Sequence, residues 1–134
     1  MEKQNAFSEK RHAILEVLMT QGHPSAESIY HALKPRFPRL SLGTVYRTLQ
    51  RFKREGLLRG LAVVAGQERF DGDTSEHAHF ICDTCNAICD VNIPLPDDIE
   101  KSVKEDGFQV YVRQLFLRGR CPQCAKKSKM LCAL

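Results

Sequence analysis

The sequence predicts an α+β fold in two parts, a helical first half that ends in a β-hairpin and a smaller second half of mixed structure. Three observations support this prediction. Apolar residues recur at helical spacing up to residue 55, the spacing changes to that of strands from residue 57, and two matched pairs of cysteines follow in the second half. Of the 134 residues, 43% are hydrophobic, which is enough for a core but leaves each half alone with a thin one.

Three helices are expected in the first half. The first covers residues 8–20, with Ser8 as a suitable N-cap. A second follows Ser25 and stops before Pro35, and a third covers residues 41–55. The apolar stripe of the third helix comprises Leu42, Val45, Tyr46, Leu49 and Phe52. Its opposite face is polar and basic, with Thr44, Arg47, Thr48, Arg51 and Arg54.

The hairpin follows this third helix directly. Residues 58–64 and 68–70 have the character of short strands around a turn at Ala65 and Gly66, so the hairpin would lie as a wing beside the helix. Three helices joined by turns, with a basic outer face on the third, are the outline of a module that binds double-stranded DNA. We therefore expect the third helix to enter the major groove.

Four side chains of that helix are candidate DNA contacts. Arg47 and Arg51 can reach base edges or phosphates, and Tyr46 can offer its ring to a thymine methyl group. A place for Tyr46 in the core is an equal alternative, because it also fits the apolar stripe. The candidate DNA-binding residues are Thr44, Tyr46, Arg47 and Arg51.

Charge is divided unevenly between the two halves. Residues 1–64 carry 11 Lys+Arg and 5 Asp+Glu, a net charge of +6, and residues 65–134 carry 9 and 11, a net charge of −2. A basic module for an anionic partner joined to a metal-binding module fits this division. No membrane-length apolar run or secretory signal is found, so we expect a soluble cytoplasmic protein.

The second half begins with the polar segment 71–76, which contains Gly72 and is the expected hinge. Strands are predicted at residues 79–81 and 87–91. A helix of roughly ten residues should open at Asp97-Asp98 and end at Gly107. A strand is then expected from Phe108 to Leu117.

The cysteine pairs indicate a structural zinc site. Each C-x2-C pair places two thiolates on one tight turn, and two pairs complete a tetrahedral shell with no open position for chemistry. Disulfides are the alternative, but in a chain without a secretory signal zinc is favoured. The four ligands would be Cys82, Cys85, Cys121 and Cys124. Of the other two cysteines, we expect Cys89 to be a packed core thiol and Cys132 a free, exposed one.

A second constellation precedes the first pair of cysteines. His77 and His79 lie two apart beside a predicted strand, so both imidazoles can face one ion. His23, Asp71 and Asp90 could converge on the same place. Spacing alone also allows His23 to be a solvated turn residue and the two carboxylates to be ordinary residues at strand ends. We expect His12 and His31 to be surface residues.

The chain as a whole resembles members of the ferric uptake regulator family, and within that family the peroxide-sensing branch. The matching segments span nearly the whole chain in order: Arg11 to Leu15, His23 to Tyr30, Thr44 to Leu49, Arg69 to Asp71, His77 to Cys82, Asp90 and the second cysteine pair.

The resemblance implies a winged-helix DNA-binding domain at residues 1–70, a hinge at 71–76 and an α/β dimerisation domain at 77–134. It also implies a homodimer that binds an inverted-repeat operator when a regulatory metal is bound. The regulatory site carries over onto His23, Asp71, His77, His79 and Asp90. Imidazoles and carboxylates suit Fe(II) or Mn(II), which leaves zinc to the cysteines.

The carboxylate at position 90 favours the peroxide-sensing branch, because iron-uptake members typically have Glu there. The implied function is a repressor of peroxide-stress genes that is inactivated when bound iron and hydrogen peroxide oxidise His23 or His77. An iron-uptake repressor is the alternative. A zinc-ribbon module that binds RNA or protein would leave the histidines unexplained, and an enzyme is not expected because little of the chain remains for a substrate pocket.

Overall fold

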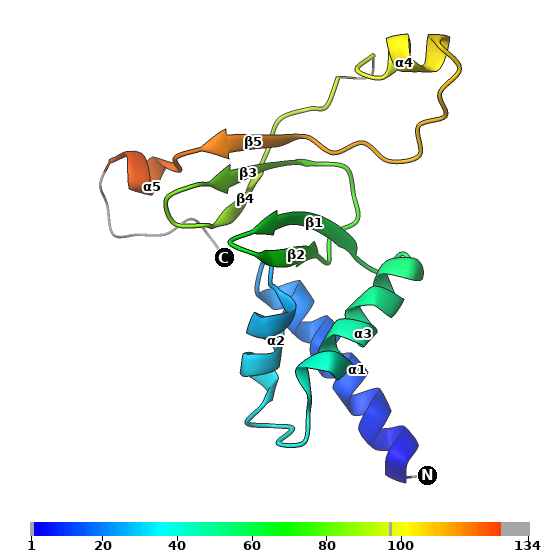
Figure 1. Cartoon of the computed structure of the whole chain (residues 1–134), viewed down its shortest axis with the longest axis vertical. Coiled ribbons are helices and arrows are strands. Elements are labelled where there is room, and N and C mark those ends of the chain that lie inside the picture. The colour runs from blue at the N-terminus through cyan, green and yellow to red at the C-terminus, as the bar shows by residue number, and fades with distance from the viewer. Residues whose placement is uncertain (1, 97, 127–134) are drawn as a thin grey trace. The chain divides into compact units, whose positions relative to one another are not determined.

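The computed structural model of the chain describes residues 2–96 and 98–126 (Figure 1). These residues form two compact units, and the boundary between them falls between Thr74 and Ser75. None of the helices in this part of the chain has the length and apolar character needed to cross a membrane. Cys132 lies outside the described residues.

Unit 1 contains α1 (Glu2–Thr20), α2 (Ala26–Leu33) and α3 (Leu42–Arg54), followed by a hairpin of β1 (Arg59–Val64) and β2 (Gln67–Asp71). Figure 1 shows the three helices gathered on one side of this hairpin. The first helix starts at Glu2, so the prediction of Ser8 as its N-cap is wrong. Residues 2–7 contain neither Gly nor Pro and include good helix formers, so nothing stops the helix at Ser8.

The starts of α2 and α3 follow their capping residues as predicted. The Ser25 hydroxyl accepts a hydrogen bond from the Ser28 N–H at 3.1 Å, and the Ser28 hydroxyl accepts one from the Ser25 N–H at 3.0 Å. This reciprocal arrangement is a capping box. The Ser41 hydroxyl caps α3 by accepting from the Thr44 N–H at 3.1 Å.

The core of unit 1 lies between its helices and β2, and its stripe on α3 differs from the predicted one. Val45, Leu49 and Phe52 are fully buried, but Tyr46 is 48% exposed and Leu42 is 40% exposed. The alternative that placed Tyr46 in the core is therefore wrong. Thr48 is buried instead, because it follows Val45 by three residues and so lies on the same face of the helix. The Thr48 hydroxyl donates to the Thr44 carbonyl at 2.8 Å.

The hairpin forms where the sequence predicts it. β1 and β2 pair antiparallel, with Val64 opposite Gln67. Ala65 and Gly66 between them have φ angles of 53° and 80°. Two consecutive left-handed residues match the twist of the flanking strands, which is the usual geometry of a two-residue hairpin turn.

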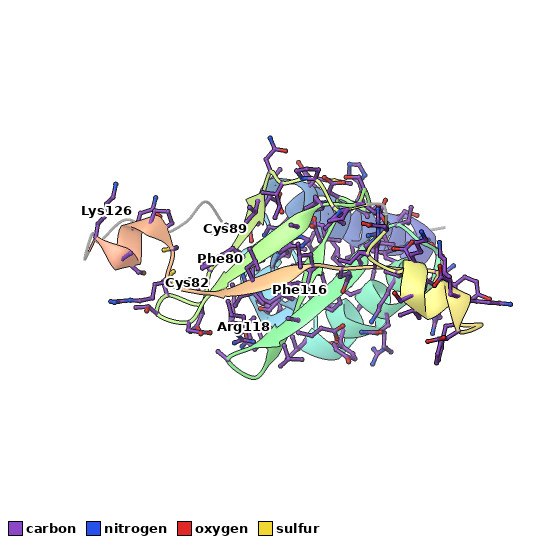
Figure 2. The ribbon with its side chains drawn as sticks, turned by 90° about the horizontal axis from the view of Figure 1, so that it is seen from above. Phe80, Cys82, Cys89, Phe116, Arg118 and Lys126 are labelled. Atoms are coloured by element: carbon purple, nitrogen blue, oxygen red, sulfur yellow. The ribbon has the colours of Figure 1, made fainter. Side chains whose placement is uncertain are left out.

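Unit 2 is built on a sheet with strand order β4-β3-β5. The central strand, β3 (Ala78–Cys82), pairs antiparallel with β4 (Ile88–Val91) and parallel with β5 (Phe116–Gly119). Figure 2 shows Phe116 near one end of this sheet and Cys82 at the other, beside α5 (Pro122–Ala125). The two cysteine-bearing segments thus meet at the same end of the sheet.

Two predictions for unit 2 are wrong in extent. The helix α4 covers only Lys101–Glu105, because the Lys101 N–H donates to the Asp98 carbonyl in a tight turn before it. Residues 108–115 are not a strand, and only Phe116 to Gly119 join the sheet. A strand needs a partner along its length. Within the described residues of this single chain, Phe108, Tyr111 and Val112 remain exposed instead.

Candidate metal centres and DNA-binding helix

The four predicted zinc ligands lie together in unit 2. Cys82 is the last residue of β3, and Cys85 lies in the turn that leads to β4. Cys121 is the N-cap of α5, and Cys124 lies within that helix. The parallel pairing of β3 with β5 places Cys82 opposite Gly119, just before Cys121, and so brings the two pairs together.

The geometry of this cluster fits a tetrahedral metal ion. The four Sγ atoms lie within 4.8 Å of one another, and those of Cys85 and Cys121 are 3.9 Å apart. Four thiolates at about 2.3 Å from a zinc ion would be about 3.8 Å apart. None of the described cysteines is joined in a disulfide. A closed four-sulfur donor set of this kind suits Zn(II).

Backbone N–H groups favour a thiolate at Cys82. The N–H groups of Cys121 and Cys85 both donate to Cys82 Sγ at 3.4 Å, and they lower the pKa of that thiol to about 6. The hydrogen bond of Cys124 with Cys121, together with burial, raises the pKa of Cys124 to about 12. The neighbouring sulfurs thus hinder the ionisation of Cys124, and a divalent cation among the four would favour the thiolate there.

Cys89 packs against the edge of this cluster. It is half-buried and touches the apolar group formed by Cys82, Ala87 and Cys121. In β4 it lies opposite Phe80 of β3. Cys89 is therefore a packed thiol outside the ligand set, although it is less buried than a core residue.

His23 and Asp71 form a buried pair in unit 1. His23 Nε2 lies 3.4 Å from Asp71 Oδ2, and their side chains are only 5% and 7% exposed. Two hydrogen bonds tie the turn that carries His23 to β2. The Phe70 N–H donates to the Pro24 carbonyl at 2.9 Å, and Arg69 Nε donates to the His23 carbonyl. Arg69 lies in the same Arg-Phe-Asp segment as Asp71, but no sequence pattern indicates this role for it.

His77, His79 and Asp90 form a second group, in unit 2. The antiparallel register places His79 directly opposite Asp90. Asp90 Oδ1 lies 3.1 Å from His77 Nε2 and 3.4 Å from His79 Nε2. His77 Nδ1 lies 2.8 Å from the Ser75 carbonyl, which can only accept a hydrogen bond. A proton on Nδ1 would complete this hydrogen bond and leave the lone pair of Nε2 for a metal.

Both groups have the chemistry of an oxygen- and nitrogen-ligated metal site. Ligand atoms at about 2.1 Å from one ion lie about 3 to 4 Å apart, which agrees with the separations within each group. Imidazole and carboxylate donors suit Fe(II) or Mn(II) better than a thiolate set does. The structure brings His23 to Asp71, and His77 and His79 to Asp90.

The candidate DNA contacts lie on the accessible face of α3. Thr44, Tyr46, Arg47 and Arg51 are all at least partly exposed. Arg47 Nη2 donates to the Thr44 hydroxyl at 3.3 Å, so the guanidinium lies along the first turn of its own helix. Arg51 Nε donates to Glu55 at 2.9 Å and shares that carboxylate with Arg11 at 3.9 Å. Arg47 is thus less restrained by acidic neighbours than Arg51.

Comparison with known proteins agrees with these features. A sequence profile of the ferric uptake regulator family matches residues 2–118. The peroxide operon regulator of Bacillus subtilis is 41% identical over 120 residues, which cover 88% of this chain and 83% of that protein.

Two solved structures share the fold. The Campylobacter jejuni peroxide stress regulator matches with a TM-score of 0.76 and 25% identity, over 92% of this chain and 94% of that one. The ferric uptake regulator from Pseudomonas aeruginosa, solved with manganese, matches with a TM-score of 0.62 and 30% identity, over 84% and 87% of the two chains. Together with the profile match, these similarities show that the chain belongs to the ferric uptake regulator family.

Proposed function

We propose that this chain is a metal-dependent, DNA-binding repressor of peroxide-stress genes. The observation that carries the proposal is the presence of two chemically different kinds of donor, the four clustered sulfurs and the imidazole–carboxylate groups found in each unit. The sulfur set suits a permanent structural ion, and the second set suits an ion that changes with conditions. The 41% identity to a peroxide operon regulator supports the same function.

The regulatory ion would be held by both units. His23 and Asp71 belong to unit 1, and His77, His79 and Asp90 belong to unit 2. An ion bound by all five would fix the angle at the hinge of residues 71–76, between a DNA-binding domain at 1–70 and a dimerisation domain at 77–134. Binding shifts the protein toward the arrangement that binds metal better, and DNA that needs the same arrangement then binds more tightly.

The protein would act in the cytoplasm as a homodimer. Because a homodimer has two-fold symmetry, its DNA partner would be an inverted repeat. Two copies of α3 would enter major grooves about one helical turn apart. The exposed apolar side chains of unit 2 support a dimer surface there, since a single chain leaves them in water. They include Ile93, Ile99, Val103, Phe108, Tyr111 and Val112.

Peroxide would be sensed by oxidation of the ligands themselves. Iron(II) bound at the regulatory site would supply the redox chemistry that reduces hydrogen peroxide next to His23 and His77. The net reaction inserts one oxygen atom into a ring C–H bond of one of these imidazoles, and the other oxygen atom of hydrogen peroxide leaves as water. The oxidised ring binds metal more weakly, so the hinge is freed and DNA is released. Each event consumes a protein molecule, so this is not enzymatic turnover.

The test compares iron-loaded and manganese-loaded protein after treatment with hydrogen peroxide. We expect loss of operator binding in the iron form, together with a mass increase of one oxygen atom on the tryptic peptide that contains His23 or His77. Manganese does this chemistry poorly, so the manganese form should keep both its mass and its DNA. Dithiothreitol should not restore binding. Release that follows cysteine oxidation and reverses with dithiothreitol would instead leave a metalloregulator without histidine-based sensing.

A further inference from the structure

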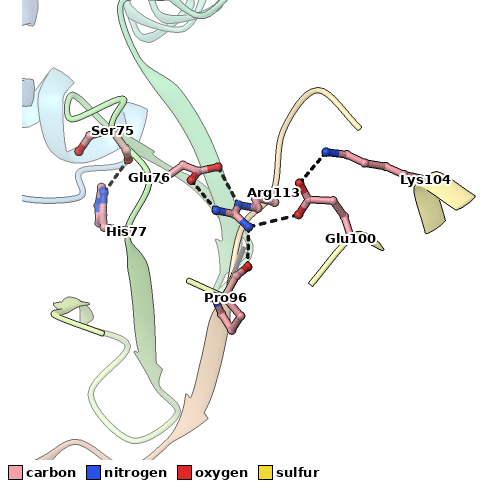
Figure 3. A network of polar contacts seen from close by, with 7 residues as sticks. All are labelled: Ser75, Glu76, His77, Pro96, Glu100, Lys104 and Arg113. Carbon is pink, nitrogen blue, oxygen red and sulfur yellow. Dashed lines mark hydrogen bonds and ion pairs between the residues drawn. The ribbon is translucent and has the colours of Figure 1, made fainter. Parts of the chain in front are cut away.

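Arg113 is the centre of a polar network in unit 2 (Figure 3). Its Nε and Nη2 donate to the two carboxylate oxygens of Glu76 at 2.9 and 3.0 Å. Its Nη1 donates to the Pro96 carbonyl at 2.7 Å and to Glu100 at 3.2 Å. Glu100 in turn pairs with Lys104 at 3.1 Å. One guanidinium therefore joins three segments that are distant in the sequence.

The geometry of this network is unusually restrictive for a surface ion pair. The pairing with Glu76 is bidentate, which fixes direction as well as distance. The Arg113 side chain is only 20% exposed, although most residues around it in the segment 107–115 are exposed. The hydrogen bond with Glu76 raises the pKa of Arg113 further, so its charge is permanent.

Glu76 is the residue immediately before the metal-ligand candidate His77. Figure 3 shows the two side chains on opposite sides of the chain, with Glu76 extending to Arg113 and His77 turning back to Ser75. The Ser75 carbonyl and Asp90 hold the two ring nitrogens of His77, at 2.8 and 3.1 Å. The backbone that carries His77 is thus held from one side by Arg113, and its ring is held from the other.

We propose that Arg113 is a positioning residue for the regulatory metal. By holding Glu76 it fixes the backbone at the entry to β3 and so keeps His77 Nε2 directed toward Asp90. The inference rests on the proposed function, because it takes His77 and Asp90 to be metal ligands. It adds to that function a residue that touches no metal and that none of the sequence patterns indicates.

A positioning role and a simple charge effect predict opposite results. A fixed cation near a cation-binding site repels the metal, so on charge alone the removal of Arg113 would tighten metal binding. If Arg113 acts by positioning, its removal weakens binding. Substitution of a residue that orients a metal ligand typically lowers affinity by about 10- to 100-fold.

The experiment measures Mn(II) binding to the full-length, zinc-loaded protein by the electron paramagnetic resonance signal of free Mn(II). We expect Arg113→Gln to bind Mn(II) about 10-fold more weakly than the wild type, at the lower end of the range for such residues. Glu76→Gln should show the same loss, and the double variant should lose no more than either single one. Arg113→Lys should stay weak, because lysine keeps the charge but cannot form the bidentate pair.

Two matched variants separate positioning from general loss of structure. Glu100→Gln removes the α4 branch of the network but leaves Arg113 paired with Glu76, and its Mn(II) affinity should stay within about twofold of the wild type. Arg118→Gln removes a different arginine ion pair of the same unit, the exposed one with Asp83 at 3.0 Å, and should also bind normally. Zinc content and thermal melting of each variant report folding directly. If Arg113→Gln does not fold, Arg113→Lys carries the test, because it keeps the charge and removes only the bidentate pair.

Unchanged or tighter Mn(II) binding in Arg113→Gln or Glu76→Gln would overturn the positioning role. Full recovery in Arg113→Lys would also overturn it, since charge alone would then suffice. His77→Ala tests the underlying site in the same assay. If His77→Ala binds Mn(II) like the wild type, the regulatory site itself is wrong and the role of Arg113 falls with it. Loss of binding in His77→Ala with normal binding in Arg113→Gln would reject only the positioning role.

Discussion

At the scale of single residues, two of the candidate ligands, His23 and His77, are held by neighbours outside the ligand set. Arg69 and Phe70 hold the turn of His23 through backbone carbonyls, and the Ser75 carbonyl contacts Nδ1 of His77. These supports matter because a metal site is only as well formed as the groups that orient its ligands. A ligand substitution should therefore weaken metal binding at this site while the four cysteines keep their zinc.

His23→Ala tests this at the proposed link between the units. We expect it to abolish the Mn(II)-dependent part of operator binding while zinc content and dimer mass stay unchanged, because His23 is the imidazole that unit 1 contributes. Fluorescence anisotropy with and without Mn(II) measures operator binding. A chelator assay measures zinc content, and light scattering measures the mass of the dimer. His12→Ala, which removes an exposed histidine from the same unit, is the control. Retention of metal-dependent binding in His23→Ala would remove His23 from the ligand set.

The ligands could be proposed from sequence, but their supports could not. His77 and His79 were indicated by spacing beside a strand, and four cysteines by two C-x2-C pairs. The contacts of Arg113 with Glu76 join residues 37 positions apart and follow no local pattern. Long-range pairs of this kind depend on how loops fold back, which periodicity does not encode.

At the scale of elements, local signals predicted a structure well where they acted within the element. Ser25 and Ser41 cap their helices, and Ala65-Gly66 forms the hairpin turn, because caps and turns need only adjacent residues. Residues 108–115 have strand character, but a strand also requires a neighbour. That requirement is not met within the described residues of one chain, and the predicted strand is wrong there.

The helix α3 is the element on which DNA binding is proposed to depend. Arg47→Ala should weaken operator binding by about 1–3 kcal/mol if the guanidinium contacts a guanine. Within the described residues, Arg47 has a hydrogen bond to Thr44 to exchange before it can reach DNA, whereas Arg51 is held by Glu55. Anisotropy titrations at several salt concentrations measure both affinity and salt dependence. Arg118→Ala, which removes an exposed charge from unit 2, controls for net charge, and an Arg47→Ala protein with unchanged affinity and salt slope would exclude this contact.

At the scale of the whole molecule, the two units are stabilised by different means. Unit 1 has an apolar core that includes Ile14, Ile29, Leu49, Phe52 and Phe70, all fully buried. The buried cluster around the sulfurs of unit 2 consists of Cys82, Ala87 and Cys121, with partly buried residues against it. Two of these three buried residues are candidate metal ligands, so we expect the folding of unit 2 to depend on the metal.

Cys82→Ser tests this difference between the units. Cys82 Sγ accepts hydrogen bonds from the backbone N–H groups of Cys85 and Cys121, one from each cysteine pair. Its substitution therefore removes a zinc ligand and the sulfur that links the two pairs. Apparent binding free energies of structural zinc sites are about 10–16 kcal/mol, more than a small unit can lose and stay folded. We expect loss of zinc, loss of the dimer and unfolding of residues 75–126, while the apolar core keeps residues 2–74 folded. Hydrogen exchange with peptide resolution separates the two units, and light scattering reports the dimer. Cys89→Ser removes a thiol of the same unit from outside the ligand set and should keep zinc, dimer and protection. A Cys82→Ser protein that remains a folded, DNA-binding dimer would show that the four-cysteine site is not what holds unit 2 together.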